Sequence, residues 1–321
     1  MLSRVADHLY WLNRYLERTE HTARVLDLTL NMLLEQRSEK VTNERMNRLL
    51  ESLYAQSLNE GATLYDFTHA LACNQSNPAS IISSLAQARE NARQIREQIS
   101  SEMWEHLNTL YHQIRRTNIE DVWQAQTTHT FFRNIKEGVQ LFQGLTDSTM
   151  SHNECWQFLQ VGRYMERANC IARLLDVQFR ALQQSTYYPV IAKDYLDWVG
   201  LLKCCTAFEA YCKVYTADLR PERIAEFLLL NIEFPHSIHF SVDMIDHALK
   251  AIDSATATTR AARLNRMIGK LKAQLRFSQI DEVMESGLSN YLQEIQKQCG
   301  KIHDAIYEVF ITYPVEKALA S

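Results

Sequence analysis

The sequence predicts an all-α protein in which two tandem, homologous helical units pack together as a pseudo-twofold bundle. Two observations favour helices: the 321 residues include only eight glycines and five prolines, and leucine, alanine, glutamate, glutamine and arginine abound. A third observation, an internal repeat, predicts the two units. With 46% hydrophobic residues the chain can bury a large core, so its fold needs no disulfide or structural metal.

The repeat is one helical segment written twice, since residues 14–27 return 149 positions later as residues 163–176. Across residues 9–28 and 158–177, eight of twenty positions are identical, and six of these eight are charged or aromatic. The repeated residues are Arg14, Tyr15, Glu17, Arg18, Arg24 and Asp27, with the counterparts Arg163, Tyr164, Glu166, Arg167, Arg173 and Asp176. Helix propensity alone would not select them, so the pattern predicts paired charges with fixed partners.

Helical spacing divides the first copy into three faces. One face is apolar and is predicted to pack in the core; it consists of Leu12, Leu16, Ala23, Leu26, Leu30 and Leu33. The adjacent face is mainly polar and consists of Trp11, Glu17, Glu20, Arg24, Asp27 and Asn31. We expect Arg14, Arg18 and Val25 to lie opposite the core. In the second copy Asn169 and Cys170 replace Glu20 and His21, and Gly162 replaces Asn13, so the first copy carries more charge.

A second repeat, in which residues 71–84 resemble residues 228–241 at an offset of 157 and Pro78-x-Ser80 matches Pro235-x-Ser237, extends the duplication beyond the first helix. Each unit is predicted to contain a long helix, then a second helix (about 42–60 and about 193–216), and then a short helix ending at Asn74 or Asn231. We expect Pro78 or Pro235 to open the next helix in its first turn. The units are predicted to span residues 1–147 and 148–321, since Gly144, Asp147, Ser148 and Ser151 interrupt the apolar pattern near residues 144–153.

One charged pattern occurs only in the first unit. Arg89, Arg93 and Arg96 share a helix face, and Glu90 and Glu97 flank them. The matching stretch of the second unit has Asp246, Lys250 and Asp253 instead. We call the three arginines the Arg comb.

Composition and missing motifs narrow the function classes. A net charge of -4 and a pI near 6.3 argue against a general nucleic-acid binder, and no stretch is long and apolar enough for a membrane span. The opening residues lack a leader pattern, so a cytoplasmic location is expected. The seven cysteines contain no Cys-x-x-Cys pair and are expected to be reduced core residues. No phosphate-binding loop or dinucleotide fingerprint is present, so no cofactor is predicted.

A metal centre is not predicted either. Helical bundles build such centres from inward glutamates and Glu-x-x-His pairs, and the nearest approach is Glu17, Glu20 and His21, of which only Glu17 is kept in the second copy.

The sequence resembles the alpha-E family, bacterial helical proteins named for a repeated Glu-Arg motif. The resemblance covers nearly the whole chain and rests on residues 1–6, 9–11, 14–18, 89–93, 96–100, 141–145, 162–168, 225–230 and 234–237. Members of the family look like partners of a circularly permuted ATP-grasp protein, often near a transglutaminase-like protein. The resemblance therefore implies a system that makes or processes an amide-linked peptide, in which any amide ligase activity is exerted together with the ATP-grasp partner.

Two interpretations of the charged residues stay open. In the first, the repeated glutamates and arginines bridge helices and fix their register in a non-catalytic scaffold that docks partners. In the second, they line one pocket with the Arg comb and bind a carboxylate or phosphate. The candidate site residues are Arg14, Glu17, Arg18, Glu20, Arg24, Asp27, Arg89, Arg93, Arg96, Glu97, Arg163, Glu166, Arg167, Arg173 and Asp176. A stand-alone enzyme is the third and weakest alternative.

Overall fold

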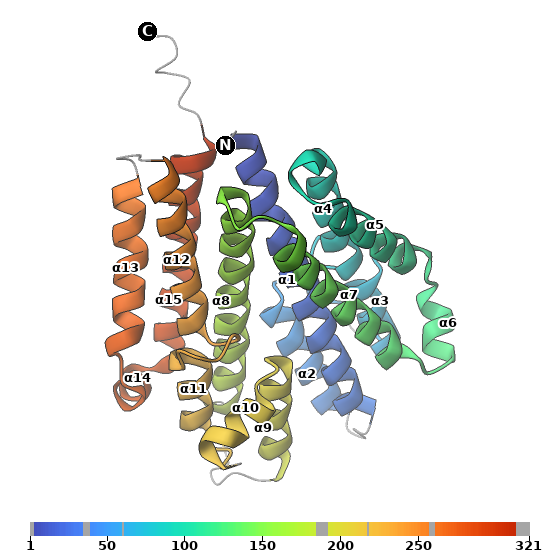
Figure 1. Ribbon diagram of the computed structural model, residues 1–321. Coiled ribbons are helices and arrows are strands. Elements are labelled where there is room, and N and C mark those ends of the chain that lie inside the picture. The colour runs from blue at the N-terminus through green and yellow to red at the C-terminus, as the bar shows by residue number, and fades with distance from the viewer. Residues whose placement is uncertain are drawn as a thin grey trace.

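The computed structural model describes residues 3–34, 39–59, 61–183, 192–216, 218–256 and 261–312, and every regular element in these ranges is a helix. Two long helices lie side by side through the middle of the molecule (Figure 1). They are α1 (Ser3–Leu34) and α8 (Glu154–Gln183), which contain the two copies of the repeat. At 1.5 Å per residue each is about 45 Å long, so the pair spans the whole bundle.

Helices from the first half of the chain cover one side of α1. In chain order they are α3 (Leu64–Ala72), α4 (Ile81–Gln94), a short 3-10 turn (Arg96–Gln98), α5 (Ser101–Arg116), α6 (Ile119–Gln124) and α7 (Thr128–Thr149). Both α4 and α7 pack directly against α1, and α5 packs on α4 and α7. The helix α7 continues through Gly144 to Thr149, so the connection to α8 is short and covers residues 150–153.

Helices from the second half cover α8 on the other side of the molecule (Figure 1). They are α11 (Pro221–Leu230), α12 (Ile238–Thr256), α13 (Ala261–Phe277), α14 (Ile280–Ser286) and α15 (Leu288–Ile306), followed by a π-helical turn (Tyr307–Ile311). Here α12 and α15 pack directly against α8, and α13 packs on both.

The second helix of each half is shorter than the sequence predicted. The helix α2 (Glu39–Ser52) ends well before residue 60, and the region 193–216 is broken into α9 (Ala192–Cys204) and α10 (Phe208–Tyr215). The break follows from the backbone at Thr206, whose φ of +52° takes the chain out of the helix. Apolar spacing continues across this turn, so the pattern gave no sign of it.

These second helices cross over between the halves. α2 packs mainly on α8, and α9 packs mainly on α1. A salt bridge joins the two, since the Arg45 guanidinium of α2 lies 2.5 Å from the Asp197 carboxylate of α9. Arg180 of α8 in turn pairs with Glu51 of α2 at 2.7 Å.

The prolines do not open their helices, contrary to the sequence prediction. α4 and α12 begin after Ser80 and Ser237, two residues beyond Pro78 and Pro235. The Ser80 hydroxyl accepts a hydrogen bond from the Ser83 amide at 3.2 Å, and Ser237 accepts one from Phe240 at 3.0 Å. Serine is the stronger start signal because its side chain satisfies an amide that the first turn leaves unpaired.

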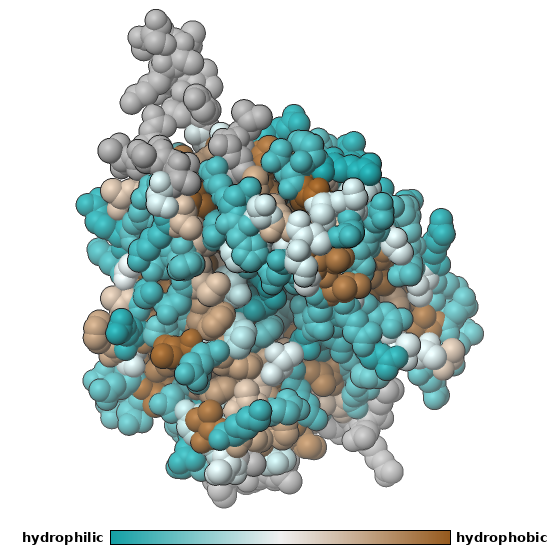
Figure 2. All heavy atoms as spheres, in the orientation of Figure 1, coloured by the Kyte–Doolittle hydropathy of each residue, from teal (hydrophilic) through white to brown (hydrophobic). Residues whose placement is uncertain are grey.

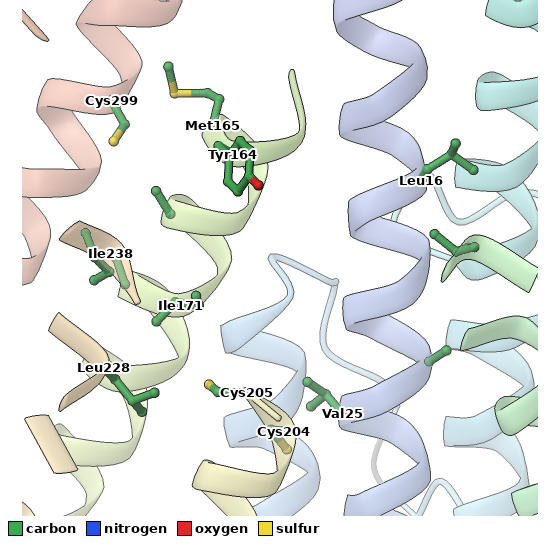
Figure 3. Packing of buried hydrophobic residues seen from close by; sticks show 14 of the residues in the cluster. Leu16, Val25, Tyr164, Met165, Ile171, Cys204, Cys205, Leu228, Ile238 and Cys299 are labelled. Atoms are coloured by element: carbon green, nitrogen blue, oxygen red, sulfur yellow. The ribbon is translucent and has the colours of Figure 1, made fainter. Parts of the chain in front are cut away.

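The helix α1 is buried on nearly all sides, which corrects the three-face description. All six residues of the predicted core face are at most 2% exposed, but Val25, placed opposite the core, is also only 2% exposed. Figure 3 shows Leu16 and Val25 pointing to opposite sides of α1, with Val25 directed toward Cys204 of α9. Amphipathic spacing assumes one wet face, and a helix at the centre of a bundle has none.

Gly162 sets how closely α1 and α8 approach. A Cβ atom at this position would lie 2.1 Å from the main-chain carbonyl oxygen of Tyr10, so no larger residue fits without moving a backbone. At the same crossing the Asn13 side chain donates to the Leu159 carbonyl at 3.0 Å and accepts from Gln143 at 2.6 Å. The exchange of Asn13 for Gly162 between the copies is thus explained by packing.

The face of the molecule in Figure 2 is mostly hydrophilic, and hydrophobic residues form small separate groups on it. None of the described helices has the length and apolar composition that crossing a membrane requires.

Candidate functional site

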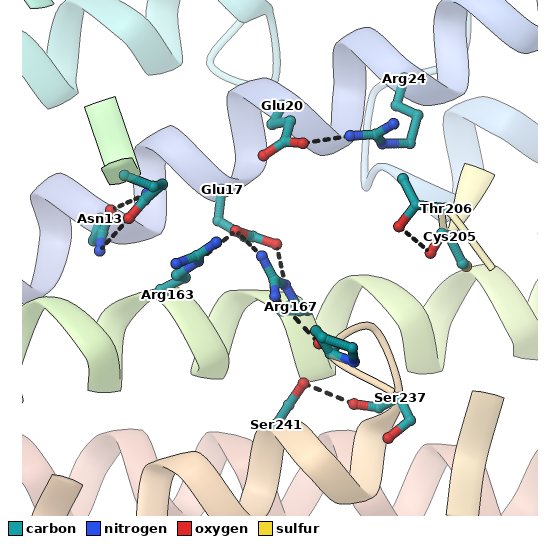
Figure 4. A network of polar contacts seen from close by, with 12 residues as sticks. Asn13, Glu17, Glu20, Arg24, Arg163, Arg167, Cys205, Thr206, Ser237 and Ser241 are labelled. Atoms are coloured by element: carbon teal, nitrogen blue, oxygen red, sulfur yellow. Dashed lines mark hydrogen bonds and ion pairs between the residues drawn. The ribbon is translucent and has the colours of Figure 1, made fainter. Parts of the chain in front are cut away.

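The repeated glutamates and arginines pair across α1 and α8, each copy with the other. Glu17 of α1 accepts two hydrogen bonds from Arg167 of α8, at 2.6 Å from Nε and 2.9 Å from Nη2 (Figure 4). Arg163 approaches the same carboxylate at 3.7 Å. Arg167 also donates to the Pro235 carbonyl at 3.1 Å, which ties the loop before α12 to this pair.

Glu166 of α8 makes the reverse contacts to α1. Its two carboxylate oxygens accept from Arg14 at 2.8 Å and from Arg18 at 2.7 Å. In the repeat, Glu166 corresponds to Glu17, and Arg14 and Arg18 correspond to Arg163 and Arg167. The contacts are therefore reciprocal; we call them the crossed pairs.

Both carboxylates stay ionised although they are buried. Burial alone would raise the pKa of Glu166, but Arg14 and Arg18 outweigh it and hold the pKa at about 2. The pKa of Glu17 is likewise lowered, because Arg167 and Arg163 overcome the effect of burial. Removing one member of such a pair leaves a buried charge without a partner, so the crossed pairs fix the register of α1 against α8.

A first cavity lies beside Glu17, and we call it the inner chamber. Its lining is Glu17, Glu20, His21, Arg24, Arg167, Cys170, Ile171, Cys204 and His236. Glu20 is ion-paired with Arg24 one turn further along α1 (Figure 4). It also accepts a hydrogen bond from Gln140 of α7 at 3.0 Å. The two carboxylates and the two guanidinium groups that line the inner chamber therefore balance in charge.

A second cavity of about 390 Å³, which we call the open cavity, lies beside Glu166. Its polar and charged lining includes Arg14, Arg18, His21, Tyr54, Glu166, Asn169, Arg173, Gln296 and His303. Here three arginines share one carboxylate, so the lining carries a positive excess. His21 and Cys170 line both cavities and separate them.

The two histidines of the inner chamber are held neutral. Burial, helped by the nearby Arg173 and Arg24, lowers the pKa of His21 to about 4 against the opposing effect of Glu17. The His21 Nε2 atom is buried and has no hydrogen-bond partner among the residues that the structure describes. Burial and the charge of Arg167 also lower the pKa of His236.

Three predicted site residues on the long helices lie outside both cavities: Asp27, Asp176 and Arg163, which approaches Glu17. Asp27 accepts from Lys136 at 2.6 Å and from His129 at 2.9 Å, both on α7. Its counterpart Asp176 binds Ser289 of α15 and Arg180 one turn away. Each of these aspartates ties a long helix to the last helix of its own half, which is a structural role.

The Arg comb does not line either cavity. Arg89 donates to Asn108 at 2.7 Å and lies over the rings of Trp104 and Tyr111 on α5. Arg93 is exposed and makes a bidentate pair with Glu90 at 2.7 and 2.9 Å. The comb therefore divides: Arg93 turns to Glu90, whereas Arg89 stays at Trp104, and α4 ends at Gln94 before Arg96.

Beyond that end, Arg96 and Glu97 lie in the exposed 3-10 turn, and Arg96 covers the Trp104 ring.

Sequence reasoning missed several cavity residues. His236 lies in the second copy of the Pro-x-Ser repeat, and that repeat was a usable signal because its loop docks on Arg167. Tyr54, Gln296 and His303 carried no such signal, since they enter from segments without a repeated pattern. Among the described residues no group of three histidine, cysteine or acidic side chains is placed to hold a metal ion, and arginines bind Glu17 and Glu20.

The arrangement can be compared with known proteins. Residues 1–311 match a family described as a predicted alpha-helical domain with a conserved ER motif. The chain belongs to the alpha-E family. In this alpha-E chain two Glu-Arg dipeptides, 17–18 and 166–167, take part in the crossed pairs.

The alpha-E chain is also similar to uncharacterized proteins of Mycobacterium bovis and Mycobacterium tuberculosis, each 21% identical over 325 residues. The match covers 95% of the chain but 36% of each relative, so the chain spans about a third of the length of these relatives. No solved structure matches the chain significantly.

Proposed function

We propose that this alpha-E chain is a helical subunit of a system that forms amide or peptide bonds, and that it acts with a circularly permuted ATP-grasp protein. In this proposal the open cavity holds an acidic or phosphorylated group of the substrate. The observation that carries it is the cavity lining, in which Arg14, Arg18 and Arg173 face the single carboxylate of Glu166. Guanidinium groups bind carboxylates and phosphates with two parallel hydrogen bonds, and ATP-grasp chemistry uses both kinds of group.

The proposal includes two homologous units, 1–147 and 148–321, related by a pseudo-twofold axis. Reciprocal contacts support it: Glu17 binds Arg167 and Glu166 binds Arg18, as a twofold relation between two copies requires. The order of packing supports it too, since α4 and α7 cover α1 as α12 and α15 cover α8. A cavity between the units would then be a natural place for a ligand.

Reconstitution tests the role. The chain and a circularly permuted ATP-grasp protein from the same organism are purified together, supplied with ATP and isotopically labelled amino acids, and assayed for a labelled amide product. We expect the pair to co-purify and to form product that neither protein forms alone. Product formation by the ATP-grasp protein alone at the same rate would refute the proposal.

A scaffold is the second candidate, and the burial of the crossed pairs favours it. In that case the chain docks ATP-grasp and transglutaminase-like partners, and its charges serve only the fold. Arg173→Gln separates the candidates, because Arg173 makes no ion pair in the described chain and its loss should not weaken the bundle. Lost product with retained co-purification supports the substrate-binding role, while unchanged product supports the scaffold. Arg93→Gln, on the exposed surface, is the matched control.

A further inference from the structure

The two cavities are counterparts in the repeat but are not alike. Six lining residues of the inner chamber, at positions 17, 20, 21, 24, 167 and 170, correspond to positions 166, 169, 170, 173, 18 and 21 of the open cavity. His236 corresponds in the same way to Ala79 through the Pro-x-Ser repeat. Differences between matched positions therefore indicate what each cavity can hold.

One difference removes a charge. In the inner chamber Glu20 neutralises Arg24 across one helical turn. In the open cavity Asn169 takes the place of Glu20, and its amide donates to the Met165 carbonyl at 3.0 Å. Arg173, the counterpart of Arg24, consequently makes no ion pair with any described residue.

A second difference opens space. The imidazole of His236 fills part of the inner chamber, whereas Ala79 presents only a methyl group to the open cavity. The cavity is thus larger at the same place where a guanidinium group lacks its carboxylate. A smaller side chain and one fewer negative charge are the two changes that would let the open cavity accept an anion.

The Arg173 guanidinium is also held in place for binding. It lies 4.0 Å from the ring centroid of Tyr54, and its Nε donates to the Asn169 carbonyl at 3.3 Å. Stacking on a ring fixes the plane of a guanidinium group and leaves N–H groups at its edge for an acceptor. Arg14 and Arg18 are already occupied by Glu166, which leaves Arg173 as the charge available to a ligand.

A second polar atom at this place has no partner. His21 lines the open cavity as well as the inner chamber, and its buried Nε2 atom makes no hydrogen bond in the described chain. A buried polar atom without a partner costs free energy unless a ligand or water satisfies it.

We propose that the open cavity is an anion site in which Arg173 binds a carboxylate or a phosphate group, and that the inner chamber, its counterpart, is closed to such ligands by Glu20 and His236. The site deepens the proposed function, on which its biological role rests, because it names the cavity and the residue that take the acidic group. The two copies of the repeat then have different roles: the inner chamber stabilises the bundle, and the open cavity binds an anion.

Calorimetric titration of the isolated chain with inorganic phosphate and, separately, with N-acetylglutamate tests the site. The decisive variant is Asn169→Glu, which restores the carboxylate of the inner chamber and should neutralise Arg173 across one turn. We expect the unaltered chain to bind at least one probe, and Asn169→Glu and Arg173→Gln to weaken that binding tenfold or more. Arg24→Gln removes the matched guanidinium from the inner chamber and should change the affinity less than twofold. The probe that binds more tightly shows whether phosphate or carboxylate is preferred.

Three results would overturn the site: neither probe binds, both cavity variants bind as tightly as the unaltered chain, or Arg24→Gln weakens binding as much as Arg173→Gln. Circular dichroism confirms that each variant is folded, and Arg173→Gln serves if Asn169→Glu is not. Failure here is distinct from failure of the proposed function. Anion binding without product formation in the reconstituted pair would refute only the latter, and product formation without anion binding would refute only the site.

Discussion

Glu17 and Arg167 are joined by two hydrogen bonds across the two central helices, and their counterparts Glu166 and Arg18 are joined in the reverse direction. The two contacts lock α1 against α8, because a shift of one turn would break both at once. Since the carboxylates are almost fully buried, their value lies in specifying the arrangement more than in adding net stability.

Glu166→Gln should destabilise the protein strongly. The change leaves the charges of Arg14 and Arg18 partly buried without their carboxylate, and breaking a buried pair costs about 3 to 5 kcal/mol. Urea unfolding followed by circular dichroism measures the loss. Glu90→Gln, which breaks the exposed pair with Arg93, is the control and should have a much smaller effect. Equal losses in the two variants would contradict a register role for the crossed pairs.

Gly162→Ala should also be destabilising, by about 2 kcal/mol or more, because the added methyl group meets the Tyr10 carbonyl and forces α1 and α8 apart. Gly144→Ala is the matched control. It lies in an exposed part of α7 with nothing near its Cβ position, so it should stabilise the helix by about 0.5 to 1 kcal/mol. Thermal unfolding of both variants tests the difference in sign. A neutral Gly162→Ala would mean that the helices do not approach this closely.

Lowering the pH from neutral should lower the free energy of unfolding in two steps. The pKa of His21 is about 4 in the folded chain and near 6.5 when unfolded, so between these values the unfolded chain binds more protons. Stability is therefore full above about pH 6.5 and declines toward pH 4, by about 3 kcal/mol. Glu166, with a folded pKa of about 2 against 4.5, adds a second decline from pH 4.5 toward pH 2.

Chemical unfolding at a series of pH values tests this dependence. His21→Gln should make the decline below pH 6.5 smaller and leave the lower step in place; the part that remains comes from His236, whose pKa is also lowered. The exposed His247 provides a matched control through His247→Gln. An unchanged slope in His21→Gln would show that His21 is not the group responsible.

The cysteines should differ sharply in reactivity. Cys204 and Cys205 are buried, and burial raises the pKa of both thiols, that of Cys204 to about 12. We expect neither to react with iodoacetamide at pH 8 until the protein unfolds, while half-buried Cys212 reacts earlier. Mass spectrometry of timed samples locates the modified residues. Early labelling of Cys204 would indicate that α9 separates from α1 in the native state.

The all-helical fold was predictable because composition alone limits the alternatives, and the alpha-E family was predictable because its Glu-Arg motif is distinctive. The core face of α1 was also correct. Helix ends were less accurate: Thr206 breaks the region predicted at 193–216 through a backbone angle that apolar spacing does not register. The starts of α4 and α12 were misjudged because Ser80 and Ser237 outcompete the neighbouring prolines as caps.

The candidate site was predictable only as far as local spacing reaches. Pairing of Glu17 and Glu166 with fixed partners was anticipated, and both lie in such pairs. Partner identity was out of reach, since Arg167 lies 150 residues from Glu17. For the Arg comb, spacing suggested a shared face, but only Arg89 and Arg96 meet over the Trp104 ring, while Arg93 pairs with Glu90 on the exposed surface. These long-range contacts are set by tertiary packing, which residue spacing along a single sequence does not reveal.

The exchange of α2 and α9 between the long helices has a consequence for how the protein comes into being. Each half contributes one helix that packs on the long helix of the other half. When only the first half has been synthesised, α2 therefore lacks α8, the helix against which it packs. The native state can therefore form completely only after α8 and α9 have been synthesised. Either half produced separately would expose the apolar surface that the other half's helix covers.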